Sequence, residues 1–290
     1  MLSTATGVAY IHEPFNPGRR LGLCGAPIDK WYQYICAENE HEFSDDIEKT
    51  LRFVFNPAGQ WRRIHSFRAL AGTGRVCGNF LRYRLCQSRP LLKAPMALFS
   101  APWLAERFDM HVVLIVRHPG AVASSLKGLR GAVPVRQILS DLLDQPLLMR
   151  DHLYPFEDDI RKLLSSGSDI LDQAALLWKV IYHVALKYTK QHPDWTVIRY
   201  VDLARDPLKG CRELFYRAKL EFGERQEREV HWHCSGIDLK TEEIENPWAV
   251  RRNSSSQMGS WRSRLTRAEI SRVRSSVEEV AHHFYADADW

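Results

Sequence analysis

The chain has 290 residues, of which 45% are hydrophobic and 26% charged, and its formal net charge is +5. This length and composition predict one globular domain, or one domain with lobes, that buries a sizeable core. The basic excess is small and evenly spread, so we expect no nucleic-acid partner. No apolar run approaches the ~18–20 residues that a membrane span needs.

The N-terminus and the cysteines indicate the compartment. Residues 1–10 lack the basic start and the apolar stretch of a signal peptide. The six cysteines include no CxxC pair and no disulfide-framework spacing, which favours reduced thiols in a cytoplasmic protein. The HWHC sequence at 231–234 lacks a second ligand pair at a familiar spacing, so we expect no metal site. The sequence carries no signal for an oligomeric state.

The first third of the chain alternates short apolar runs with helical patterns. Residues 8–14, VAYIHEP, predict a strand that ends in a polar cluster, followed by a loop at 16–18. The further elements expected here are a helix near 45–55, a partly helical segment over 61–85, a short strand over 90–95 that ends at Lys93, and a helix over 98–108.

Residues 111–126, HVVLIVRHPGAVASSL, are the most informative segment. The apolar run 112–116 predicts a buried strand with Arg117 at its carboxyl end, and Pro119 is suited to open the helix that follows. Ser125 falls about two turns into that helix. A helix N-terminus beside a guanidinium and a hydroxyl suits a phosphate, so this corner predicts a phosphate-bearing ligand. A surface ion pair for Arg117 and an ordinary helical position for Ser125 remain the alternatives.

The second half continues the alternation after one exception. Residues 131–168 contain Pro134, Pro146 and Pro155 and are expected to be the least regular stretch, an insertion or a lid. The elements expected after it are a helix over 170–190, a strand over 195–201, a helix from Asp206-Pro207 to about 220, and a last helix to about 284 opened by the capping box of Thr266 and Glu269.

This alternation predicts an α/β fold with a mainly parallel sheet flanked by helices. Polar residues follow several of the strands, and in such a sheet the carboxyl ends of the strands meet at one crevice. The polar residues expected at that crevice are His12, Glu13, Lys93, Arg117 and Asp202.

Three motifs in order resemble the sulfotransferases that use 3′-phosphoadenosine 5′-phosphosulfate (PAPS). They are RHPGAVASSL at 117–126, VIRYVDLARDP at 197–207 and SSSQMGSWRSRLT at 254–266. IHEPFNP at 11–17 and LLKAP at 91–95 also resemble the bacterial and carbohydrate branches of that family. The resemblance implies a single sulfotransferase domain over the whole chain, with a fold like that of the P-loop nucleoside triphosphatases and with PAPS as co-substrate.

The resemblance also implies which residues bind the nucleotide. Arg117 and Ser125 match the pair that binds its 3′-phosphate, and Tyr200 matches a residue beside the adenine. Many members place a basic residue and a glycine where a C-terminal loop closes on the same phosphate, whereas this chain has serines. The serines at that place are Ser254, Ser255 and Ser256.

For the chemistry, the resemblance implies that Glu13 is the catalytic base and that Lys93 lies near the reacting group. The acceptor is expected to be a hydroxyl of a small molecule or, because of the Glu-Pro motif, of a glycan. The acceptor oxygen would attack sulfur in line, as in phosphoryl transfer, without a metal. An ordinary loop acid at Glu13 and a solvated charge at Lys93 are the alternatives.

One part of the family pattern has no counterpart here. The Gly-Ser/Thr-rich 5′-phosphosulfate loop would precede residue 8, so the sequence predicts an N-terminally truncated domain without that strand and loop. A catalytically inactive remnant is therefore an alternative function. A histidine phosphatase or mutase, suggested by VRHPG at 116–120, and a P-loop kinase are the others.

Overall fold

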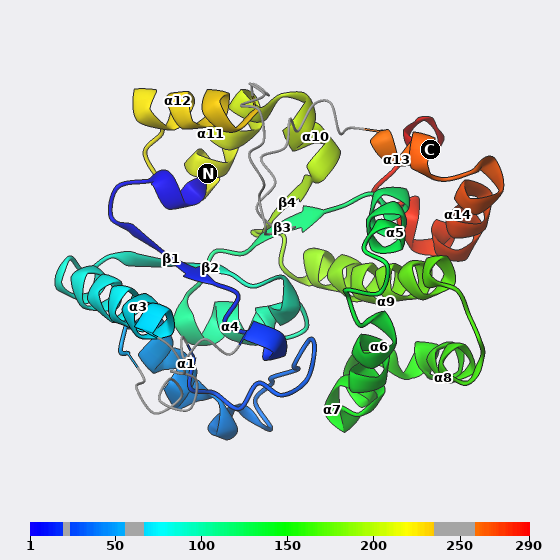
Figure 1. Ribbon diagram of the computed structural model, residues 1–290, viewed down its shortest axis with the longest axis horizontal. Coiled ribbons are helices and arrows are strands. Elements are labelled where there is room, and N and C mark those ends of the chain that lie inside the picture. Colours follow the sequence, from blue (N-terminus) through cyan, green and yellow to red (C-terminus); the bar gives the residue numbers. More distant parts are fainter. Residues whose placement is uncertain (20–23, 56–66, 235–258) are drawn as a thin grey trace. The chain divides into compact units, whose positions relative to one another are not determined.

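A computed structural model of the chain describes residues 1–19, 24–55, 67–234 and 259–290 (Figure 1). The protein is α/β, and helices predominate over short parallel strands. Contacts divide the chain into two compact units. Unit 1 comprises Met1–Ala5, His111–Arg136 and Asp158–Trp290, and unit 2 comprises Thr6–Met110 and Gln137–Glu157. The helices α6 (Val135–Leu143) and α8 (Glu157–Ser165) carry the chain from one unit to the other.

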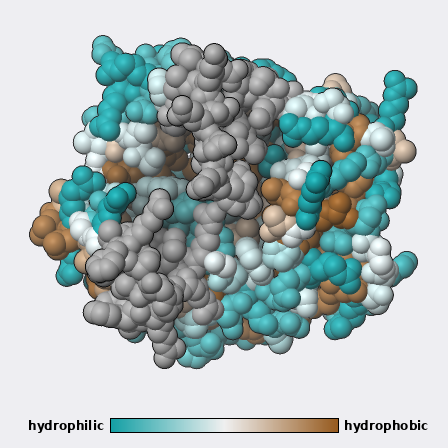
Figure 2. Space-filling view, viewed as in Figure 1, coloured by the Kyte–Doolittle hydropathy of each residue, from teal (hydrophilic) through white to brown (hydrophobic). Residues whose placement is uncertain are grey.

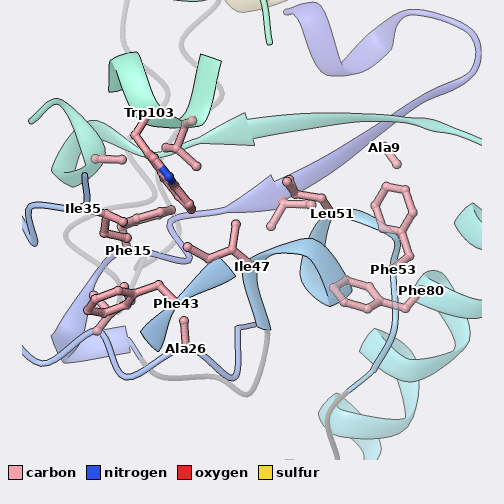
Figure 3. Close-up of a cluster of buried hydrophobic side chains, with 14 residues drawn as sticks. Ala9, Phe15, Ala26, Ile35, Phe43, Ile47, Leu51, Phe53, Phe80 and Trp103 are labelled. Carbon is pink, nitrogen blue, oxygen red and sulfur yellow. The ribbon is translucent and has the colours of Figure 1, made fainter. Parts of the chain in front are cut away.

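Unit 2 is built around the parallel strands β1 (Val8–His12) and β2 (Arg89–Lys93), whose register places His12 opposite Lys93. Ala9 and Ile11 are buried while Tyr10 is exposed, as the alternation of a strand requires. The other elements of unit 2 are α1 (Ser44–Leu51), α3 (Phe67–Leu85), α4 (Ala101–Phe108), α7 (Pro146–Leu148), a π-helix (Met149–Leu153) and 3₁₀ helices at Pro17–Arg19, Glu40–Glu42, Pro95–Ala97 and Tyr154–Phe156. Their apolar faces form one core, which includes Phe15, Ile35, Ile47, Phe80 and Trp103 (Figure 3).

Unit 1 contains the second parallel pair, β3 (Val113–Val116) and β4 (Thr196–Arg199). Its other elements are α5 (Pro119–Gly128), α9 (Ile170–Gln191), α10 (Tyr200–Arg205), α11 (Pro207–Arg217), α12 (Glu224–Cys234), α13 (Ser260–Arg264), α14 (Arg267–Ala281) and 3₁₀ helices at Leu2–Thr4 and Asp287–Asp289. The long helix α9 packs against both α5 and α14 (Figure 1). Its apolar face, with Trp178 at 2% exposure, shares a core with Val116, Trp261 and Val277.

Most predicted elements are confirmed, including both halves of the capping box at the start of α14. Two expectations about the strands need correction. The strand predicted over 195–201 ends at Arg199, because Tyr200 already begins α10. The described strands form two separate two-stranded ladders instead of one continuous sheet, and each ladder packs on the core of its own unit.

The expectation that 131–168 is the least regular stretch is wrong, because most of it is helical. Pro134 directly precedes α6, and Pro146 opens α7. Proline is tolerated at a helix start, where its missing N–H would have no intrahelical partner. These prolines therefore start helices where the sequence analysis took them for breaks. Arg136 on α6 also donates to the carbonyls of Leu163 and Ser166 at the end of α8.

Hydrophilic side chains cover much of the described surface in the view of Figure 2, with smaller hydrophobic patches between them. Single exposed apolar side chains such as Leu85, Tyr154 and Tyr216 are normal on a globular surface. Within the described ranges, no helix combines the length and the apolar character that crossing a bilayer requires.

Candidate functional site

Arg117 lies at the corner between β3 and α5, and hydrogen bonds hold its backbone in place. The Arg117 N–H donates to the Tyr182 hydroxyl at 3.1 Å, and the Arg117 carbonyl accepts from the Trp178 indole N–H at 2.8 Å. Both partners lie on α9. His118 caps α5, its Nδ1 accepting from the Gly120 N–H at 3.1 Å. The backbone of the corner is thus fixed, while the Arg117 side chain is exposed.

An aromatic cage encloses the His118 ring. The ring stacks on Trp261 with centroids 4.6 Å apart, and meets Tyr285 and Trp290 edge-on at the same centroid separation. Burial, helped by the nearby Arg262 charge, lowers the pKa of His118 to about 4. A neutral ring whose Nδ1 accepts a hydrogen bond carries its proton on Nε2. Nε2 has no hydrogen-bond partner within the described part of the chain, and aromatic side chains surround the ring.

Gly120 is required by the approach of Trp261 to α5. A Cβ at Gly120 would lie 2.7 Å from two ring carbons of Trp261, well inside contact distance. Only a residue without a side chain lets the indole reach His118 at this point. The glycine of the RHPG motif therefore serves the packing of a segment more than a hundred residues later in the chain.

A cavity of about 700 Å³ opens beside this corner, within the size range of small-molecule sites. Arg117 and Ser125 line it from the β3–α5 corner, and Tyr200 and Arg205 line it from α10. The prediction that Arg117, Ser125 and Tyr200 belong to one site is consistent with this geometry. Asp202, also expected at a strand end, is instead paired with Arg199 through two hydrogen bonds of 2.6 and 2.7 Å.

The charge of this pocket is positive. Among the described residues that line it are the exposed arginines Arg117, Arg205, Arg262 and Arg264, against the single acid Asp289. Such an excess of guanidinium groups in a concave site attracts anions. The charge of this pocket therefore suits an anionic ligand.

Several residues of the pocket were missed by the sequence analysis, among them Ser124, Arg205 and Arg264. Ser124 is buried, and its Oγ has no hydrogen-bond partner among the residues that the structure describes. The adjacent Ser125 was predicted from its place in the helix and from the family motif, although the pair SS offers both hydroxyls. Arg205 and Arg264 each lie in the last turn of a short helix, at α10 and α13. Both arginines lie inside the motifs at 197–207 and 254–266, and this position was the signal available in the sequence.

The third nucleotide-binding element predicted from the sequence cannot be placed in the same way. Ser254, Ser255 and Ser256 lie outside the described residues. Gly259 and Trp261, from the same motif, do line the pocket.

Unit 2 brings Glu13 and Lys93 together at the ends of β1 and β2. The Glu13 N–H donates to the Lys93 carbonyl at 2.8 Å, and the Lys93 ammonium donates to Glu13 Oε1. Asn16 donates to the other oxygen, Oε2, at 2.9 Å. The Glu13 side chain is 12% exposed and that of Lys93 48% exposed. Lys93 is therefore partly solvated, as its alternative interpretation expects, and it is also ion-paired with Glu13.

The Glu13 carboxylate is held in its ionised form. Burial by itself would raise the pKa of Glu13, but the hydrogen bonds from Lys93 and Asn16 outweigh burial and hold it below its usual value. The Glu13 backbone has a φ of 47°, in the left-handed region that costs a non-glycine residue about 1–3 kcal/mol. His12, one residue earlier, meets the Tyr10 hydroxyl through Nδ1 at 2.9 Å. The strand end thus holds a fixed carboxylate.

No protein-family model, curated protein or solved structure gives a significant match to this chain. We therefore infer the function from the motifs and the geometry of the chain itself.

Proposed function

We propose that the protein transfers a sulfuryl group from PAPS to a hydroxyl group of a small molecule or a glycan, on a sulfotransferase fold. One observation carries the proposal. Arg117, Ser125 and Tyr200 come from two motifs that are far apart in the sequence, and they line one positively charged pocket. These are the residues that the motifs assign to the 3′-phosphate and the adenine of the nucleotide.

The pocket residues suit the parts of such a nucleotide. The Arg117 guanidinium can donate two parallel hydrogen bonds to a phosphate, and the Ser125 hydroxyl can donate a third. The Tyr200 ring, 38% exposed, offers an aromatic face to a purine. The caged position of His118 argues against the phosphatase alternative, because a nucleophilic histidine needs an accessible ring nitrogen.

The reaction that we propose exchanges one bond at sulfur for another and moves one proton. The acceptor oxygen forms an O–S bond while the bond between sulfur and the 5′-phosphate oxygen breaks, and adenosine 3′,5′-bisphosphate leaves. The proton of the acceptor hydroxyl passes to the Glu13 carboxylate. Lys93 keeps this carboxylate oriented and ionised through the ion pair. General-base assistance of this kind contributes about 10²–10⁴-fold to the rate.

Nucleotide binding tests the proposal directly. Isothermal titration of the full chain with adenosine 3′,5′-bisphosphate should show one site. Arg117→Ala should weaken that binding about thirtyfold, the order expected when a charge-assisted phosphate contact is lost. The matched control is Arg228→Ala, which removes an exposed arginine of α12 that pairs with Glu224. A wild-type chain that does not bind, or equal affinities for Arg117→Ala and the wild type, would refute the proposed function.

A further inference from the structure

The segment that follows α14 forms one wall of the pocket. Tyr285, Ala288 and Asp289 all line the cavity. The Tyr285 hydroxyl donates to the Val116 carbonyl at 3.1 Å, which ties this segment to the end of β3. The wall is therefore anchored to the same strand that leads into Arg117.

Asp289 connects this wall to the two other walls. Its carboxylate Oδ2 accepts from Arg199 Nη1 at 3.1 Å and from the Ala286 N–H at 3.0 Å, and its carbonyl accepts from Arg262 Nη2 at 2.6 Å. Arg199 directly precedes Tyr200 at the start of α10, and Arg262 directly follows Trp261 on α13. One residue thus joins the segments that carry α10 and α13.

The charge of Asp289 and its contacts have opposite expected effects on an anionic ligand. A carboxylate on the wall of an anion pocket repels the ligand, so its charge alone can only weaken binding. Its hydrogen bonds hold the segments on which Tyr200 and Trp261 lie, and a site formed in advance binds more tightly because less ordering is needed on binding. Whether a substitution at Asp289 raises or lowers the affinity for the ligand therefore distinguishes the two roles.

We propose that Asp289 is a positioning residue, which acts through Arg199 and Arg262 to hold the α10 and α13 walls at the spacing that a nucleotide needs. The proposal rests on the proposed function for its ligand, adenosine 3′,5′-bisphosphate. Arg199 supports the same arrangement, because it also donates to the Phe284 carbonyl at 3.1 Å and lies over the Tyr285 ring.

The test compares nucleotide affinities of full-length variants by isothermal titration. Asp289→Ala removes the side-chain contacts and should weaken binding about tenfold, although it removes a repelling charge. Asp289→Asn keeps an oxygen that can accept from both Arg199 and Ala286, and should stay within about threefold of the wild type. Asp287→Ala is the matched control, since Asp287 belongs to the same turn, is 88% exposed, pairs with Arg274 and does not line the cavity.

A second variant covers the case in which Asp289→Ala does not fold, as judged by circular dichroism. Asp289→Glu keeps the charge but displaces the oxygen by one methylene, and it should also weaken binding several-fold. Equal or tighter binding by Asp289→Ala or Asp289→Glu would overturn the positioning role. If the wild type binds and Arg117→Ala weakens binding as expected, equal or tighter binding by Asp289→Ala or Asp289→Glu overturns this inference and leaves the proposed function standing. If the wild type itself fails to bind the nucleotide, the proposed function and this inference fall together.

Discussion

Among the residues of unit 1 that the structure describes, four arginines and one acid line the pocket, whereas in unit 2 Glu13 and Lys93 form an ion pair at the ends of two strands. The guanidinium groups of unit 1 leave a positive excess for a ligand to neutralise. The Glu13 carboxylate of unit 2 is already paired with Lys93 and Asn16. It therefore offers a fixed proton acceptor and no free charge for a ligand. In the proposed function, affinity for an anion is therefore assigned to unit 1, and the proton acceptor is assigned to unit 2.

Replacing the carboxylate tests this division most strongly. We expect Glu13→Gln to lower sulfuryl transfer by about 10²–10⁴-fold, because an amide cannot accept the proton. Affinity for adenosine 3′,5′-bisphosphate should change less than twofold. Transfer of labelled sulfate from PAPS to a panel of hydroxyl acceptors measures the first quantity, and titration the second. Glu106→Gln on α4 is the control, an exposed acid of unit 2. A normal rate in Glu13→Gln would remove Glu13 from the mechanism.

The aromatic cage of unit 1 predicts a pH dependence of stability. The pKa of His118 is about 4 in the folded protein and 6.5 as the ordinary value. Above pH 6.5 neither state binds the proton, so His118 has no effect there. Between pH 6.5 and 4 only the unfolded state binds it, and the free energy of unfolding should fall by up to about 3 kcal/mol.

Urea unfolding at pH 7, 5 and 4 measures this effect. His118→Asn can still cap α5 but removes the titrating ring, so its stability should depend less on pH than that of the wild type. His282→Asn, at an exposed position, is the control. Identical pH profiles for His118→Asn and the wild type would show that the ring is not held neutral.

The close approach of Trp261 to α5 predicts a smaller effect than the rate change of Glu13→Gln or the pH dependence from His118. Gly120→Ala should lower the free energy of unfolding by about 1–3 kcal/mol, because the new methyl group must displace the indole. Gly128→Ala, on the same helix, meets nothing within 4 Å and should stabilise the protein by up to about 1 kcal/mol. Chemical denaturation of both variants measures the two changes in the free energy of unfolding. Equal changes would contradict the close packing of Trp261 on Gly120.

Local patterns predicted much of the fold because they depend on neighbours in the chain. The apolar run 112–116, Pro119 at the start of α5 and the capping box of Thr266 and Glu269 each indicated an element that the structure contains. The same reasoning was wrong for 131–168. The prolines there were interpreted as breaks, although proline equally opens a helix, and only the packing of Ile138 and Leu142 decides between the two.

The sequence by itself predicted most of the strands and helices, and it led to the proposal of a phosphate ligand at the Arg117 corner. Only the tertiary structure decided that Trp261 stacks on His118, and that Arg205, Arg264 and Asp289 line the same pocket as Arg117. The physical reason is the range of the interactions. Hydrogen bonds along a helix and alternation along a strand act over a few residues and leave a periodic trace. Stacking and ion pairs between distant segments depend on how the elements pack, and a single sequence leaves no periodic trace of them.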